Sequence, residues 1–135
     1  MRYFKNIFSL ISLAILFAGC TERNTTDPNK SYEYWVGGKL SKGVKAIHAQ
    51  YWQSAHWSKE YIIYIELAAY PEWKDQLIKQ NHLILSQQKL DIPEDAPKWF
   101  KPLKDYKYWQ NPQNTSCEYF EDTSTGHFFV YEEQL

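Results

Sequence analysis

The chain has 135 residues, in which 15 Lys and Arg oppose 16 Asp and Glu and aromatic residues make up 18%. This length suits one domain, and the near-neutral charge excludes the basic footprint expected of a nucleic-acid-binding protein. The aromatic content argues against a disordered chain, because large apolar side chains can bury enough surface to offset chain entropy.

The beginning of the chain has the pattern of a secretory signal peptide. Arg2 and Lys5 give a basic start, and the run from Ile7 to Phe17 is uncharged and mostly apolar. This run is too short to cross a hydrocarbon core, which needs about 20 apolar residues. A basic start and a short apolar run that ends in small residues predict a signal peptide over residues 1–19.

The segment Phe17-Ala18-Gly19-Cys20 resembles the lipobox of bacterial lipoproteins, with Phe17 where that family usually has Leu. The resemblance implies cleavage before Cys20, a diacylglyceryl group on its thiol and an acyl chain, such as palmitate, on its amino group. Two or three acyl chains anchor a protein durably. The implied location is the cell envelope, lipid-anchored and facing the periplasm. Because Thr21 replaces the Asp that retains lipoproteins in the inner membrane of well-studied Gram-negative bacteria, the outer membrane is favoured where there is one.

The segment after Cys20 is polar. Thr21 to Ser31 contains no large apolar residue, so residues 20–31 are predicted to be a lipidated cysteine with a flexible tether, and residues 32–135 the single globular domain. Once Cys20 is lipidated, Cys117 has no partner for a disulfide, and we expect it to be buried beside a strand.

Two strands and one helix are predicted next along the chain. Tyr61 to Ala69 alternates with period two and is apolar on nearly both faces, which indicates a central strand. Val44 to Trp52 fits both helical and strand spacing, and we favour a strand that pairs with the next one. Pro71 begins a helix that ends near Asn81. Its buried face is predicted to contain Trp73, Leu77 and Ile84.

A long loop and a hairpin complete the domain. Asp91 to Pro112 contains four prolines and is predicted to be an ordered loop held by aromatic side chains. Cys117 to Glu121 and His127 to Glu133 are strand-like and are joined by a turn in which Gly126 can take a positive φ. We therefore expect a small α+β domain with a mostly antiparallel sheet of about four strands, one main helix and a long Pro- and Trp-rich loop.

Motifs for catalysis or metal binding are missing from the sequence. The four His lack zinc-ligand spacing, and there is no nucleophile elbow or glycine-rich phosphate loop, so we predict no metal and no cofactor. Glu66 is a carboxylate within an apolar strand. It is either a tuned acid or base, or a residue that faces solvent or pairs with a Lys.

Aromatic residues of the long loop are the candidates for binding. The six Trp exceed what one small core needs, and Trp and Tyr suit interfaces and sugar-stacking surfaces. Trp99, Phe100 and Trp109 are therefore the candidate binding residues. The alternative is that these rings fill the core beneath the loop.

Two functions are consistent with these observations. The first is a membrane-anchored envelope lipoprotein whose domain is a non-enzymatic binding module, in one version an inhibitor or immunity-type protein, with an envelope protein or the cell wall as its partner. The second is a small peptidoglycan- or glycan-acting hydrolase or a sugar-binding accessory protein, with Glu66, Glu118 and Asp122 as candidate acids. The lack of a catalytic motif favours the first.

Overall fold

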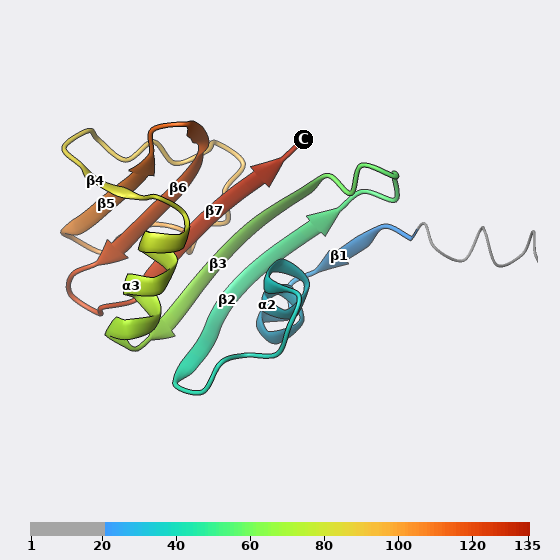
Figure 1. The fold of residues 1–135 in the computed structure, drawn as a ribbon, viewed down its shortest axis with the longest axis horizontal. Helices are drawn as coiled ribbons and strands as arrows, with labels where there is room; N and C mark the ends of the chain where they lie inside the picture. Colours follow the sequence, from blue (N-terminus) through green and yellow to red (C-terminus); the bar gives the residue numbers. More distant parts are fainter. Residues whose placement is uncertain (1–20) are drawn as a thin grey trace, which may run out of the picture.

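The computed structural model of the chain describes residues 21–135, so the predicted signal peptide and Cys20 lie outside the described residues. The elements in chain order are β1 (Arg23–Thr25), α2 (Pro28–Val36), β2 (Val44–Gln53), β3 (Tyr61–Ala69), α3 (Pro71–Gln80), β4 (Ile84–Ser86), β5 (Tyr106–Asn111), β6 (Asn114–Asp122) and β7 (Phe128–Gln134). They form one antiparallel sheet in the order β1-β2-β3-β7-β6-β5-β4 (Figure 1). The α+β class is confirmed. The sheet is larger than expected, with seven strands instead of about four, and residues 21–135 contain two helices.

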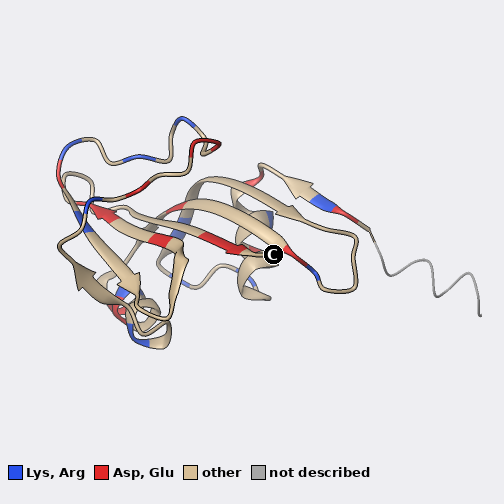
Figure 2. Cartoon of the chain, turned by 90° about the horizontal axis from the view of Figure 1, so that it is seen from above, with Lys and Arg blue, Asp and Glu red and all other residues tan. Residues whose placement is uncertain are grey.

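The sheet separates two apolar layers. Side chains alternate along β3, so that Ile63 and Ile65 join one cluster and Tyr64 joins the other. Helices α2 and α3 cover the first face (Figure 1). The connection between β4 and β5, residues 87–105, covers the second face through Leu90 and Phe100, and Figure 2 shows basic and acidic residues interspersed along it.

The centre of the sheet consists of β3 and β7, as expected from the apolar character of β3 on both faces. Its side chains have no exposed surface at Ile63, Ile65, Leu67, Phe128 and Val130. The strand prediction for Val44 to Trp52 is also confirmed. A shift of register between Ala46 and His48 interrupts its alternation, which explains why the sequence fitted helical spacing as well.

The segment predicted to be a flexible tether is instead largely ordered, because it contains β1 and the start of α2. Arg23–Thr25 pair with the end of β2, and Asp27 caps α2 by accepting a 2.9 Å hydrogen bond from the Lys30 backbone N–H. Backbone pairing and capping need no large apolar side chain, so a polar segment becomes ordered here. The folded domain thus begins at Arg23 and not near Tyr32.

Helix α3 begins at Pro71 and is capped by Asn81, as predicted, and it buries Trp73 and Leu77. Ile84 does not belong to this helix. It begins β4 and is 57% exposed, because His82 leaves the helical conformation with a φ of 52°.

The predicted loop from Asp91 to Pro112 is too long at its C-terminal end. Tyr106–Asn111 form β5, paired with β6, because Pro102 and Pro112 flank this strand and do not interrupt it. The C-terminal hairpin is confirmed, with Gly126 at a φ of 73°. Cys117 is buried on β6, as expected.

Candidate functional site

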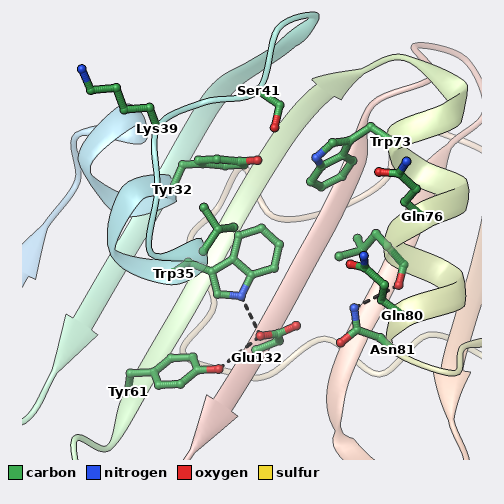
Figure 3. A pocket seen from close by; sticks show the side chains of 12 residues that line it. Tyr32, Trp35, Lys39, Ser41, Tyr61, Trp73, Gln76, Gln80, Asn81 and Glu132 are labelled. Carbon is green, nitrogen blue, oxygen red and sulfur yellow. Dashed lines mark hydrogen bonds between the residues drawn. The ribbon is translucent and has the colours of Figure 1, made fainter.

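A pocket of about 390 Å³ opens between α2 and α3 above the central strands (Figure 3). This volume lies near the lower end of the range for small-molecule sites. We call it the inter-helix pocket. Its lining comes from α2 and the segment after it, from α3, and from β3 and β7 beneath, and comprises Tyr32, Trp35, Val36, Lys39, Ser41, Tyr61, Trp73, Gln76, Leu77, Gln80, Asn81 and Glu132.

The carboxylate of Glu132 lies at the base of this pocket and accepts three hydrogen bonds. Trp35 donates to Oε2 through its indole N–H at 2.7 Å, and the Tyr61 hydroxyl donates to the same oxygen at 3.3 Å. The Tyr119 hydroxyl donates to Oε1 at 2.7 Å. These donors come from a helix and two other strands, so the packing of several elements fixes the orientation of the carboxylate. Figure 3 shows the bonds from Trp35 and Tyr61.

Both tyrosines are held in their neutral, donating form. Burial, and after it the charge of Glu132, raises the pKa of Tyr61 and of Tyr119 well above the usual value. Carboxylate oxygens offer about four acceptor positions in total. Glu132 therefore keeps acceptor capacity for a donor that enters the pocket.

The walls of the pocket combine aromatic faces with amides. Trp35 packs edge-on against Tyr32, with ring centroids 6.0 Å apart, and Trp73 comes from the opposite helix. Gln76 and Gln80 on α3 are exposed at the rim. Aromatic faces stack on flat apolar surfaces, while amides both donate and accept hydrogen bonds. The pocket thus suits a small polar group that carries hydrogen-bond donors and an apolar face.

The candidate binding residues of the sequence do not share one surface. Phe100 is 1% exposed and packs on Tyr64, Phe120 and Phe129, so it is a core residue and not a binding residue. Trp109 is partly buried against Phe128 on the helix-covered face. Trp99 is partly buried on the opposite face. The alternation of β5 separates Trp109 from the loop residues, so the three rings do not form a joint platform.

The three candidate acids have separate environments, and none of them lines the inter-helix pocket. Asp122 accepts hydrogen bonds from its own turn, at Ser124 and Thr125, and from the backbone of Leu103. Glu118 is 7% exposed, and its Oε2 has no hydrogen-bond partner in the structure.

Glu66 joins two imidazoles on the loop-covered face. Its Oε2 lies 2.7 Å from Nδ1 of His48, and its Oε1 lies 2.7 Å from Nδ1 of His127. An ionised carboxylate only accepts, so each ring donates to it through Nδ1. His48 also stacks on Trp99, with ring centroids 5.3 Å apart. This cluster fastens the loop to β2, and it corrects the expectation that Glu66 faces solvent or pairs with a Lys.

Sequence reasoning missed the inter-helix pocket and the two histidines of Glu66. Asp27-Pro28 followed by Gly37 is a helix start and stop, and it would have placed Trp35 on a helix. Within residues 21–135, no group of three or more His, Cys, Asp or Glu side chains is arranged to hold a metal ion. No helix of the described part is long and apolar enough to cross a membrane.

Comparisons of the chain with protein-family models, with curated protein sequences and with solved structures found no match. The proposals below are therefore based on the residues and their geometry.

Proposed function

We propose that this protein is a lipid-anchored binding module of the bacterial cell envelope, and that the inter-helix pocket is its binding site. The ligand is a group of the cell wall or of an envelope protein that presents hydroxyl, amide or ammonium donors. The observation that carries this proposal is the oriented carboxylate of Glu132 at the base of an aromatic, amide-lined pocket.

The pocket is built for binding more than for hydrolysis. A glycosidase uses two carboxyl groups that flank one bond. Glu132 is the single carboxylate among the residues that line the inter-helix pocket. The carboxylate accepts bonds from three neutral donors and has no second acid beside it in that lining, which favours a recognition role.

The anchor is tested by the acylation state of Cys20. Full-length protein expressed in bacteria with an alkyne-tagged fatty acid should carry the label and remain in the membrane fraction, whereas Cys20→Ser should lose both. Equal labelling of the two forms would contradict the anchor.

The pocket is tested with purified peptidoglycan and with a photo-crosslinking residue at exposed Gln76. Wild-type protein should co-sediment with peptidoglycan or form one defined crosslink to an envelope protein. Glu132→Gln should weaken this binding about tenfold, because the amide oxygen can still accept a hydrogen bond but the charge assistance, worth about 1 kcal/mol or slightly more, is lost.

Glu133→Gln is the matched control. Glu133 follows Glu132 on β7, so its side chain points to the other face of the sheet, where it accepts a hydrogen bond from the Tyr131 hydroxyl. The control variant should bind like wild type. Failure to bind peptidoglycan together with absence of a crosslink from position 76 would reject the inter-helix pocket as the site. A crosslinked secreted enzyme that loses activity on binding would identify the inhibitor version.

A further inference from the structure

The tip of the β2–β3 hairpin presents a tryptophan that the fold does not use. Trp57 is 97% exposed, the highest value among the exposed large hydrophobic residues of the described chain. The tip is nevertheless ordered: Ser54 N–H donates to the Glu60 carbonyl at 2.8 Å, and Lys59 N–H donates to the His56 carbonyl at 3.1 Å. A closed turn therefore holds this ring in water.

This tip lies at the same end of the domain as the start of the described chain. Arg23 of β1 pairs with Gln53, the last residue of β2 before the tip. The indole N–H of Trp52 donates to Glu22 at 2.7 Å and fixes the segment that precedes β1. Figures 1 and 2 both show β1 and the hairpin tip side by side. The other end of β3 points away from this region.

The distance from Cys20 to the ordered domain is short. Only Thr21 and Glu22 stand between Cys20 and β1, so the Cα atoms of Cys20 and Arg23 are separated by at most about 11 Å when the chain is fully extended. An acylated Cys20 would consequently hold this end of the domain against the bilayer surface.

We propose that Trp57 inserts into the membrane interface and is a second contact between the domain and the lipid. The inference rests on the proposed acylation of Cys20. Trp prefers the headgroup region, where its ring leaves water while its N–H keeps polar partners. Lys59, in the same turn, is exposed and can reach anionic headgroups. The partner that covers the exposed ring of Trp57 is thus the bilayer to which acylated Cys20 would attach the chain.

The test uses the full chain, purified from bacterial membranes and reconstituted in vesicles of phosphatidylcholine and phosphatidylglycerol with brominated acyl chains. Bromine quenches Trp fluorescence only at short range. Wild-type emission should be partly quenched relative to vesicles without bromine, and Trp57→Phe should lose that quenched fraction. Trp109→Phe is the matched control and should keep it, because Trp109 is partly buried on β5, on the far side of the central strands.

Mass spectrometry of the same samples separates the two proposals. Acylated protein without quenching, or quenching that persists in Trp57→Phe, would overturn the Trp57 contact and leave the anchor intact. A mass without acyl chains would reject the anchor, and the Trp57 contact with it. Quenching that is lost in Trp57→Phe and kept in Trp109→Phe supports the contact.

Discussion

Glu118 is a carboxylate that the fold buries without fully satisfying. Burial raises the pKa of its carboxyl group above the ordinary value of 4.5; a hydrogen bond with Tyr108 partly offsets this, and the charge of Asp91 adds to the rise. A raised pKa means that the folded state holds the proton more tightly than the unfolded state. The ionised form of Glu118 therefore opposes folding at neutral pH.

Replacing this carboxylate with an amide should stabilise the protein. We expect Glu118→Gln to raise the free energy of unfolding at pH 7 by about 1 kcal/mol, since the neutral amide has no charge to remove from water and burying a charged group costs more than burying a neutral one. The gain should disappear below pH 4.5, where wild-type Glu118 is protonated in both states. Urea unfolding at pH 7 and at a pH below 4.5 measures the difference in stability between the wild type and Glu118→Gln. The exposed substitution Glu94→Gln is the control and should leave stability unchanged. A lower free energy of unfolding for Glu118→Gln at pH 7 would contradict this prediction and show that the charge of Glu118 stabilises the fold.

Asp122 behaves in the opposite way. Burial raises its pKa, but hydrogen bonds from Ser124, Leu103 and Thr125 outweigh that effect and lower the pKa from 3.8 to about 2. Its contribution to stability is present above pH 3.8 and is lost as the pH falls toward 2.

Asp122→Asn should cost about 2 kcal/mol at pH 7, because several charge-assisted hydrogen bonds of the turn are weakened. Near pH 2 the two proteins should become almost equally stable, since wild-type Asp122 is then becoming protonated. Thermal unfolding of the two proteins across this range is the measurement. A difference that does not depend on pH would mean that the side chain acts only through its shape.

At the scale of elements, the most deeply buried side chain of the loop between β4 and β5 is the ring of Phe100. Phe100 is 1% exposed and contacts Tyr64, Phe120 and Phe129 edge-on. Phe100→Ala should cost about 3–5 kcal/mol of unfolding free energy, as deletions of buried aromatic rings do. Trp99→Ala should cost less, because this ring is only partly buried. Chemical denaturation of the two variants compares them, and an equal cost would show that the loop is held along its whole length.

Elements with a strong apolar period were predictable from the sequence, and those built by backbone pairing were not. Alternation along Tyr61 to Ala69 identified the central strand, and Pro71 identified the start of α3. β1 and β4 have three residues each and are set by their partners. The inter-helix pocket was missed for a related reason: Trp35 and Glu132 are 97 residues apart and meet only through the packing of α2 on the sheet.

At the scale of the whole molecule, the pocket and the proposed membrane contact share one strand end. Tyr61 lines the inter-helix pocket and, at the start of β3, pairs with Gln53 beside the hairpin tip. The inter-helix pocket would therefore bind its ligand close to the membrane surface. Under the proposed acylation of Cys20, the short segment between Cys20 and β1 would set the distance from the pocket to the membrane, and the length of this segment can be changed by insertion.

A flexible Gly-Ser insertion of twelve residues between Thr21 and Glu22 should weaken the membrane contact of Trp57 without changing ligand binding in the inter-helix pocket. Such a linker has a root-mean-square length of about 19 Å, which is enough to let the domain leave the bilayer surface. Quenching of Trp57 by brominated lipids should fall, while the melting temperature and the pocket's ligand binding stay unchanged, because Glu22 keeps its bond to Trp52. An insertion of equal length into the exposed segment Gln87–Lys89, which does not line the inter-helix pocket, would control for added chain. Unchanged quenching would mean that Trp57 holds the membrane by its own affinity and that the short tether contributes nothing to the orientation of the domain.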